Sequence, residues 1–310
     1  MLKLGIIGLG DIAKKAYLPV VGSLADVEFH LYTRNTEVLT EISNKYRFPY
    51  THTSLSSIIK SGIKGAFVHS STESHDHIVR ELLNNGIHVY VDKPITYHLG
   101  TTKELVELAE SKGLILMTGF NRRFAPFYRS ISEIDKPNMI ILQKNRHDLP
   151  GDIRSFVYDD FIHVLDTVRY LFKSDIQDVI VHGRVRSGIL YHVVVQFISR
   201  DMTGLAIMNR DSGAVEEKLE VMGTNEKRVV QDLDKLTIYR NQSETSFSFN
   251  NWDSTLFKRG FEQIIEEFIS AVRYDSLPSV TARDSLQTHE ICELVVQQLR
   301  KQELEKAHTK

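Results

Sequence analysis

The sequence predicts an α/β protein with two domains: a doubly wound parallel sheet, followed by an α+β domain with a large, open, mainly antiparallel sheet. Apolar runs alternate with amphipathic segments from residue 2 to about residue 119, which is typical of doubly wound sheets. Beyond residue 120, most strand-like segments instead alternate apolar and polar residues, which favours antiparallel strands with one buried face. We therefore predict domains at residues 1–119 and 120–310.

Composition narrows the class of protein. The chain has 310 residues, with 38 Lys and Arg against 40 Asp and Glu, and this balance favours neither nucleic acid nor an anionic membrane surface as a partner. No apolar run approaches the roughly 18 residues of a membrane span, and the first apolar stretch does not resemble a signal peptide. Cys292 is the only cysteine, so no intrachain disulfide can form, and we expect it in the core. We expect a cytoplasmic globular protein.

The first predicted strand, residues 2–7, runs into the sequence Gly8-Leu9-Gly10-Asp11-Ile12-Ala13. This is the G-x-G-x-x-A form of the dinucleotide fingerprint, directly after a strand as that motif requires. The first glycine permits the tight turn, the second lets backbone approach a pyrophosphate, and the alanine keeps the helix close to the strand. We predict that Gly8, Gly10, Asp11, Ile12 and Ala13 hold a dinucleotide at a helix N-terminus. The alternative is an ordinary glycine-rich turn.

The second predicted strand, residues 27–32, lacks the acidic residue that commonly binds the adenine ribose. Thr33 and Arg34 follow it instead. A carboxylate would repel a 2′-phosphate, whereas a hydroxyl and a guanidinium would bind it through charge-assisted hydrogen bonds. The sequence therefore favours NADP(H) over NAD(H), unless Arg34 is only a solvated residue of the next helix.

Two further strand ends carry polar side chains where such sheets bind ligands. Ser70, Ser71 and Thr72 follow residues 65–69, and we predict that they contact the cofactor, cap a helix, or do both. Asp92 and Lys93 follow residues 88–91, and Pro94 holds Lys93 in extended geometry. We expect Lys93 in the cleft where the nicotinamide lies. His75 and His77 are two residues apart and do not share a helix face, so we expect no metal.

A strand at residues 114–117 precedes the sequence Gly-Phe-Asn-Arg-Arg-Phe at 119–124. Paired arginines among aromatic residues bind anionic substrate oxygens or mark a domain hinge. We predict Arg122, Arg123 and Tyr128 as substrate-binding residues.

One helix of the second domain, residues 156–172, carries a polar face formed by Asp159, His163, Asp166 and Tyr170. A histidine with a carboxylate one turn away suits general acid–base chemistry. A solvated polar face is the alternative.

The remaining predicted strands are 139–147, 176–185, 189–199, 205–210, 217–222, 228–231 and 236–240, with helices at 257–274 and 282–302. One face of this sheet is expected to pack on helices and the other to pair subunits. Trp252 lies in a polar loop, where we expect simple packing, with a place in the site or an interface as the alternative.

The motifs GLGDIA, DKP, GFNRRF and DDFIHVLD, in that order, resemble the Gfo/Idh/MocA oxidoreductase family, and their details resemble its MviM-type subgroup. The resemblance covers essentially the whole chain. It implies an N-terminal Rossmann domain, a C-terminal domain with an open antiparallel sheet through which subunits associate, and NAD(P)-dependent oxidation or reduction of sugars, polyols or their derivatives.

The resemblance also implies residue roles. Lys93 corresponds to the lysine of the family's E-K-P motif, which contacts nicotinamide or substrate, and Asp159 with His163 corresponds to its D-x-x-x-H pair. Ser70 and His75 match a threonine and a histidine of the cofactor-binding region, where Asn121 is also expected. The chain departs from the family in Asp92 for the commoner glutamate, in S-S-T for T-P-N at residues 70–72, and in the missing acid after residue 32.

We therefore expect an NADP(H)- or NAD(H)-dependent oxidoreductase acting on a hydroxyl or carbonyl carbon, with His163, Asp159 and Lys93 as catalytic residues and a homo-oligomeric state. The alternatives are a non-catalytic dinucleotide sensor and an interaction protein.

Overall fold

The computed structural model describes residues 1–308, with side chains described up to residue 305. The chain forms two compact units, Met1–Phe120 with Phe261–His289, and Asn121–Gly260 with Glu290–Lys310. The prediction of a second domain running from residue 120 to the end is wrong in one respect, because residues 261–289 return to the first unit. Phe268 explains the return, since its ring packs 4.9 Å from that of Phe67 in the first sheet.

The first unit is built on a six-stranded sheet of order β3-β2-β1-β4-β5-β6 within the described chain. All of its strand pairs are parallel. The strands are β1 (Leu2–Ile7), β2 (Val27–Tyr32), β3 (Tyr50–His52), β4 (Gly65–Val68), β5 (His88–Val91) and β6 (Leu116–Thr118). The predicted doubly wound sheet is confirmed, and the short exposed β3 is a strand that the sequence did not reveal.

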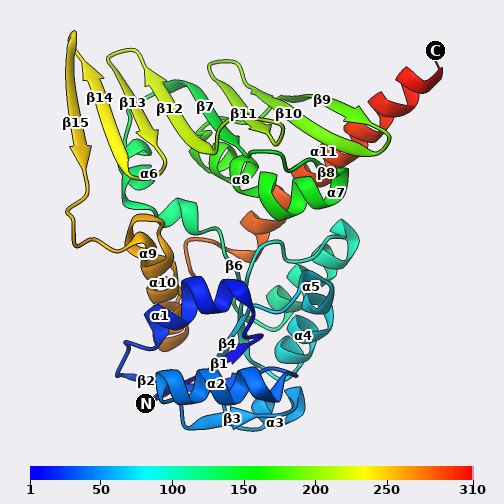
Figure 1. Ribbon diagram of the computed structural model, residues 1–310, viewed down its shortest axis with the longest axis vertical. Helices are drawn as coiled ribbons and strands as arrows, with labels where there is room; N and C mark the ends of the chain where they lie inside the picture. The colour runs from blue at the N-terminus through cyan, green and yellow to red at the C-terminus, as the bar shows by residue number, and fades with distance from the viewer. Residues whose placement is uncertain (309–310) are drawn as a thin grey trace. The chain divides into compact units, whose positions relative to one another are not determined.

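Helices cover both faces of this sheet (Figure 1). They are α1 (Leu18–Val21), α2 (Thr36–Tyr46), α3 (Leu55–Ile59), α4 (Thr72–Asn84), α5 (Leu99–Ser111), α10 (Phe261–Tyr274) and the first turns of α11 (Ala282–His308). Val68, Val89 and Val91 pack with the buried apolar residues of α4 and α5 on one face. On the other face, Phe67 packs against Tyr17 and Phe268. Burial of valine-rich strands on both faces accounts for their nearly continuous apolar character.

The segment after the fingerprint is helical but not regular. A π-helical turn, Ala13–Tyr17, precedes α1. Pro19 lies at the start of α1, where a missing N–H is tolerated. The turn is tied to the sheet by Ala13 and Tyr17, both of which are buried.

The second unit contains a nine-stranded sheet of order β15-β14-β13-β12-β7-β11-β10-β8, with β9 paired to β10, counted over the described residues. Its strands are β7 (Pro137–Asn145), β8 (Gly151–Asp152), β9 (Asp178–Arg186), β10 (Ile189–Ile198), β11 (Thr203–Asn209), β12 (Glu216–Gly223), β13 (Glu226–Gln231), β14 (Lys235–Arg240) and β15 (Ser243–Ser248). The predicted strands are present, while β8 and β15 were not foreseen. All of the pairs are antiparallel except β7 with β11, so the sheet is mixed.

Helices lie against one face of the second sheet: α8 packs on β7 and β11, and α6 on β13 (Figure 1). The helical segments are α6 (Pro126–Ile131), α7 (Ile153–Phe156), α8 (Ile162–Leu171) and α9 (Thr255–Lys258), with a 3₁₀ turn at Asn121–Phe124 and a π-helical turn at Val157–Phe161. The single helix predicted over 156–172 is thus α7, the π turn and α8 in succession.

The helix predicted over 257–274 is broken at Gly260, which has a φ of +79°. A Cβ at this position would lie 2.3 Å from the carbonyl oxygen of Asn121, so only glycine fits.

The structure also tests the expectations for Cys292 and Trp252. Cys292 is buried in the core, as expected. Trp252 is 97% exposed, so the expectation that it packs in the interior is wrong. Among the described residues, no helix has the length and apolar character of a membrane span.

Candidate active site

The turn after β1 forms a tight backbone cradle. Gly8 has a φ of +88°, and its N–H donates to the carbonyl of Tyr32 at 2.9 Å. A Cβ on Gly8 would lie 2.5 Å from the backbone nitrogen of Ser70. The loops after β1, β2 and β4 therefore meet at the carboxyl edge of the sheet, and glycine is required at their junction.

Gly10 differs from Gly8 because the space beside it is open. A Cβ built on Gly10 would have no described neighbour within 4 Å. The helical segment begins directly beyond, with Lys14 N–H donating to the Gly10 carbonyl at 3.0 Å. Open space against bare backbone at a helix N-terminus fits a pyrophosphate. The fingerprint residues therefore fit a nicotinamide dinucleotide, whose chemistry is hydride transfer.

The end of β2 presents the residues expected near the adenine ribose. Thr33 is half-buried and Arg34 is exposed. Asn35 caps α2, since its side chain accepts a hydrogen bond from the N–H of Val38 at 3.1 Å. Because capping occupies Asn35, Thr33 and Arg34 are the side chains here that remain suited to a ligand.

The end of β4 leads into α4 through the predicted serine-rich segment. Ser71 is the N-cap residue of α4, but its side chain makes no capping hydrogen bond. Instead, its carbonyl accepts from the Ser74 hydroxyl at 2.7 Å. Ser70 and Thr72 are half-buried beside it. The predicted capping by a side chain is therefore not found at Ser71, whose hydroxyl is left for a ligand or solvent.

Asp92, at the end of β5, belongs to a buried hydrogen-bonded cluster. The Tyr17 hydroxyl donates to Oδ1 of Asp92 at 3.3 Å and lies 2.7 Å from the hydroxyl of Tyr90. Burial raises the pKa of Asp92, and the charges of Lys93 and His75 oppose that rise without cancelling it. Burial likewise raises the pKa of both tyrosines. A Cβ on Gly119 would come within 2.9 Å of the Tyr90 hydroxyl, so glycine makes room for the cluster.

Lys93 follows Asp92 directly and acts on its charge. Lys93 is half-buried, and its peptide bond to Pro94 is cis. His75 is 1% exposed, and its ring contacts the carbonyls of Ser70 and Pro94. The predicted contact of His75 with cofactor is therefore revised: it lies behind the backbone of residues 70 and 94, not on the surface that a ligand would touch.

In the second unit, Asp159 and His163 lie at the junction of the π turn and α8. Both side chains are half-buried. Single-turn π segments occur often at functional sites. The described residues contain two of them, one directly after the fingerprint and one that includes Asp159. The predicted acid–base pair thus occupies a local distortion of the helix.

Arg123 and Asp166 form a buried, two-pronged ion pair. Nε donates to Oδ2 at 2.8 Å and Nη2 to Oδ1 at 2.5 Å, and the guanidinium lies 4.9 Å from the ring centre of Tyr170. Their side chains are 4% and 1% exposed. Such a pair holds the 3₁₀ turn to α8.

Arg122 forms a second pair of this kind with Glu217, with donor–acceptor distances of 2.7 and 2.8 Å. The Tyr128 hydroxyl also donates to Glu217, at 2.9 Å. Burial raises the pKa of Glu217, but the positive charge of Arg122 outweighs it and lowers that pKa to about 2. The predicted substrate roles of Arg122, Arg123 and Tyr128 are revised to structural ones. Their N–H and O–H groups already donate to Glu217 and Asp166 of the same unit.

Asn121, predicted to contact the cofactor, is also buried. Its side-chain amide donates to the carbonyl of Arg259 at 2.8 Å, which joins the 3₁₀ turn to the end of α9. We therefore assign this side chain a structural role as well.

A third charged cluster surrounds Asp160, which was not foreseen. Lys144 Nζ bonds to its Oδ1, and Arg146 and Arg210 lie 3.1 and 3.3 Å from its Oδ2. Burial, together with the charge of Arg122, lowers the pKa of Lys144 to about 7. In the sequence, nothing distinguishes Asp159 from its neighbour Asp160. In the structure, the π turn leaves Asp159 half-buried and buries Asp160.

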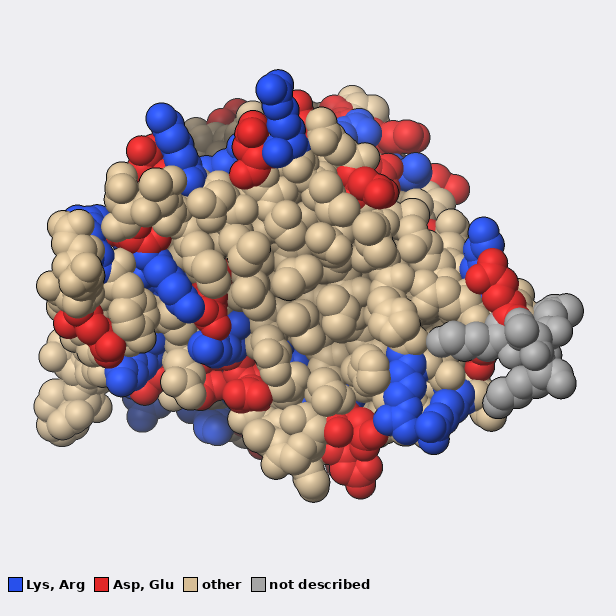
Figure 2. Space-filling view, turned by 90° about the horizontal axis from the view of Figure 1, so that it is seen from above, with Lys and Arg blue, Asp and Glu red and all other residues tan. Residues whose placement is uncertain are grey.

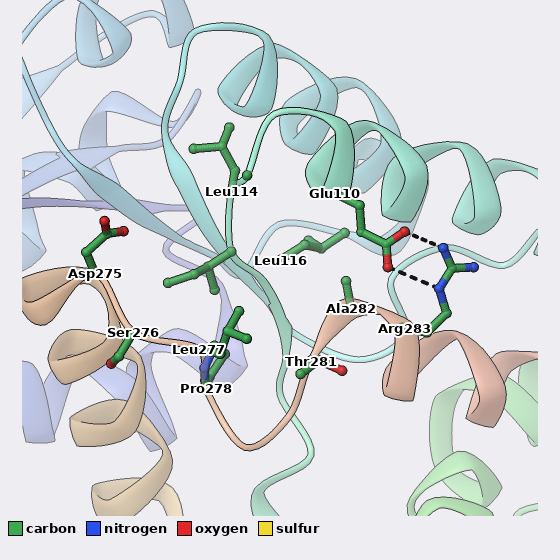
Figure 3. A pocket seen from close by; sticks show the side chains of 12 residues that line it. Glu110, Leu114, Leu116, Asp275, Ser276, Leu277, Pro278, Thr281, Ala282 and Arg283 are labelled. Atoms are coloured by element: carbon green, nitrogen blue, oxygen red, sulfur yellow. Dashed lines mark hydrogen bonds and ion pairs between the residues drawn. The ribbon is translucent and has the colours of Figure 1, made fainter.

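A cavity of about 540 Å³ in the first unit lies away from the fingerprint. Its lining includes Leu114 and Leu116, from just before and at the start of β6, and Leu277 and Pro278 of the α10–α11 connection (Figure 3). Glu110 and Arg283 close one side as an ion pair. Because the strands are parallel, this is the edge opposite Gly8 and Lys93. Among the described residues, no group of His, Cys, Asp and Glu is arranged to hold a metal ion.

Comparison with known proteins agrees with these features. A family profile described as "Oxidoreductase family, NAD-binding Rossmann fold" matches residues 2–120, and the profile of a "YceM-like, C-terminal domain" matches residues 126–241. The oxidoreductase YceM of Salmonella typhimurium is 32% identical over 299 residues, covering 94% of this chain and 96% of the relative.

Two other proteins extend the comparison. The crystal structure of the dehydrogenase MviM from Clostridium difficile has a TM-score of 0.92 and 31% identity, and the match covers 96% of this chain and 99% of that one. Myo-inositol 2-dehydrogenase of Thermotoga maritima is 23% identical over 314 residues, 91% of this chain and 92% of the relative. With its fingerprint domain, its C-terminal domain and almost its whole length matched in this way, the chain belongs to the Gfo/Idh/MocA family of oxidoreductases.

Proposed function

We propose that the protein transfers a hydride between NADP(H) and a carbon bearing a hydroxyl or carbonyl group in a sugar, polyol or related substrate. The observation that carries this proposal is the cradle at Gly8 and Gly10, open beside Gly10. Ser70 and Lys93 follow β4 and β5 at the same carboxyl edge of the sheet. A ligand at this edge meets bare backbone, hydroxyl groups and one lysine.

The preference for NADP(H) rests on the end of β2. Thr33 and the exposed Arg34 stand where a carboxylate would favour NAD(H). A guanidinium binds a phosphate through paired, charge-assisted hydrogen bonds. This arrangement supports a 2′-phosphate at Arg34.

Three residues act on the substrate in the proposed reaction. His163 takes or gives the hydroxyl proton, and Asp159, one turn earlier, orients its ring. Lys93 polarises the reacting oxygen and stabilises the negative charge that develops on it. The bound nicotinamide supplies or accepts the hydride.

The substrate class is supported by a relative. The Thermotoga maritima protein is a myo-inositol 2-dehydrogenase, which acts on a polyhydroxylated ring. We extend to this chain only that class, a small molecule rich in hydroxyl groups.

We further propose that a second copy of the chain covers the open face of the large sheet, and that the protein works in the cytoplasm. Figure 2 shows this face, opposite α8, as a broad surface with few charged side chains at its middle. Ile141, Val194, Leu205 and Ile207 point outward there and are only half-buried. An uncharged face of this kind suits association between identical subunits.

The proposed reaction is tested by offering the purified protein NADP⁺ or NAD⁺ with myo-inositol, scyllo-inositol and a set of aldoses, and following the reduced nicotinamide. We expect reduction with at least one polyhydroxylated compound, faster with NADP⁺. The His163→Ala variant serves as the matched control and should bind NADPH normally. Failure of the wild-type protein to bind either dinucleotide would overturn the proposal.

A further inference from the structure

Two buried histidines hold the segment that follows Lys93. His75 lies on α4, and His289 lies on the part of α11 that belongs to the first unit. Their exposed fractions are 1% and 0%. Both rings contact backbone of Pro94 or Ile95. A buried ring nitrogen that carries a proton needs an acceptor, and one that carries none needs a donor. The partners of each ring therefore indicate which of its nitrogens are protonated.

Two backbone contacts of His289 are of opposite kinds. Its Nε2 accepts a hydrogen bond from the N–H of Ile95 at 3.0 Å. Its Nδ1 lies 2.8 Å from the carbonyl oxygen of Ser285, to which it donates. A neutral imidazole with its proton on Nδ1 satisfies both contacts.

The hydrogen-bonding partners of His75 are all carbonyl oxygens. Its Nδ1 lies 3.0 Å from that of Pro94 and 3.3 Å from that of Ile95, and its Nε2 lies 3.1 Å from that of Ser70. A carbonyl oxygen only accepts, so both nitrogens must donate, and only the doubly protonated ring does so. A neutral ring would turn a lone pair toward one of these oxygens in a buried site.

The surroundings of His75 contain charges of both signs. Asp92 is the nearby acid, and a positive His75 lowers the pKa of its carboxyl against the larger effect of burial. His69 stays neutral, because burial, with the charge of His75, lowers its pKa to about 3. Lys93 also interacts with Asp92, and His289 lies on the other side of Ile95. The N-terminus of α4 disfavours a cation, whereas Asp92 and the carbonyls favour it.

We propose that His75 is a positioning residue that acts as an imidazolium. It donates to the loop after β4 through Ser70 and to the loop after β5 through Pro94, and so fixes the backbone on which Lys93 is carried. The two loops stay joined while the ring holds both protons, and one contact is lost when the ring loses a proton. The positioning role rests on the function proposed above, but the double protonation does not.

The protonation is tested on the wild-type protein without any ligand. The chain has 13 histidines, which selective ¹⁵N-histidine labelling makes visible by nuclear magnetic resonance. His75→Gln and His289→Gln each remove one ring and so assign its signals. We expect the signals of two ring N–H groups for His75 and of one for His289. A single N–H for His75 at every pH would overturn the proposal, whether or not the protein transfers hydride.

The positioning role is tested by NADPH affinity in the same variants. A glutamine at position 75 cannot reach the carbonyls of both Ser70 and Pro94, so we expect His75→Gln to weaken NADPH binding about tenfold at a pH where resonance shows both ring protons in the wild type. The loss should be smaller at a pH where resonance shows only one. His289→Gln should show the same ratio to wild type at both pH values. The phosphate of the cofactor also titrates with pH. This affects wild type and variants alike, so it cancels in the ratio of their NADPH affinities.

Each result bears on a separate claim. Equal pH dependence of the two glutamine variants, relative to wild type, would overturn the positioning role of His75. Absence of NADPH binding in the wild type would instead overturn the proposed function, while the resonance experiment would still decide the protonation.

Discussion

Gly8 and Ser70 lie against each other, because a Cβ on Gly8 would be 2.5 Å from the backbone nitrogen of Ser70. The loop after β1 and the loop after β4 are thus in backbone contact at the edge where we place the cofactor. Gly10, two residues later, has open space beside it. The two glycines of one motif therefore serve different purposes, which mutation can separate.

We predict that Gly8→Ala impairs folding and that Gly10→Ala impairs only binding. The first change combines a clash with a φ of +88°, and should cost more than about 1 kcal/mol of unfolding free energy. The second should leave the urea midpoint unchanged while NADPH affinity falls at least about tenfold. Urea unfolding and calorimetric titration of both variants check this. Wild-type NADPH affinity in Gly10→Ala would remove the pyrophosphate from this turn.

Substitution of Arg34 should distinguish the two nicotinamide cofactors. We expect Arg34→Ala to lower NADPH affinity by about tenfold to a hundredfold, the loss of one or two charge-assisted hydrogen bonds, and to leave NADH affinity unchanged. Asn35→Ala, which removes the cap of α2, is the matched control and should affect both cofactors alike. An equal loss for NADPH and NADH in Arg34→Ala would contradict the proposed 2′-phosphate site.

The ion pair between Arg123 and Asp166 should be costly to break from either side. Both side chains are almost fully buried, so Arg123→Met or Asp166→Leu alone takes a buried charge away from its two-pronged partner, and we expect a loss of about 3–5 kcal/mol. In Arg123→Met, Asp166 keeps only the longer contact with Arg169, at 4.0 Å, among the ion pairs described here. The double variant should recover much of that loss. Denaturant unfolding of the four proteins gives the coupling energy. Additive effects would show that the two groups do not depend on each other.

Lys144 should make stability depend on pH. Its pKa is lowered to about 7 in the folded protein by burial and by Arg122, against about 10.4 in an unfolded chain. Between these values the unfolded chain binds more protons, so stability rises with pH. We expect the wild type to gain stability relative to Lys144→Met as pH rises from about 7 to about 9. Parallel pH profiles of the two proteins would contradict this assignment.

Much of the fold could be predicted because its signals are local. The apolar runs that form β1, β2 and β5 and the glycines after β1 each specify their structure within a few residues. The return of α10 to the first unit could not be predicted, because the apolar face that packs Phe268 on Phe67 would suit either unit. The parallel pairing of β7 with β11 was also hidden, since alternation of apolar residues reports a buried face but not strand direction.

The candidate site was predicted less completely, for a related reason. The sequence identifies residue types, but not which charges neutralise one another. Arg122 and Arg123 resembled anion ligands, yet Glu217 and Asp166 hold them, and Glu217 is 95 residues from its partner in sequence. No motif marks Tyr17, which donates to Asp92, or Tyr90, whose hydroxyl bonds to that of Tyr17. The common signal of the missed residues is burial, which one sequence does not reveal.

The central claim is that Lys93 and His163 act on one substrate at a nicotinamide held by the turn after β1. A crystal structure of the NADPH complex tests it most directly. The account predicts the pyrophosphate against Gly10, with the Lys93 ammonium and a ring nitrogen of His163 both within about 2.6–3.2 Å, or one bridging water, of the place that a substrate oxygen takes beside nicotinamide C4. A complex in which His163 lies beyond that reach would contradict the account.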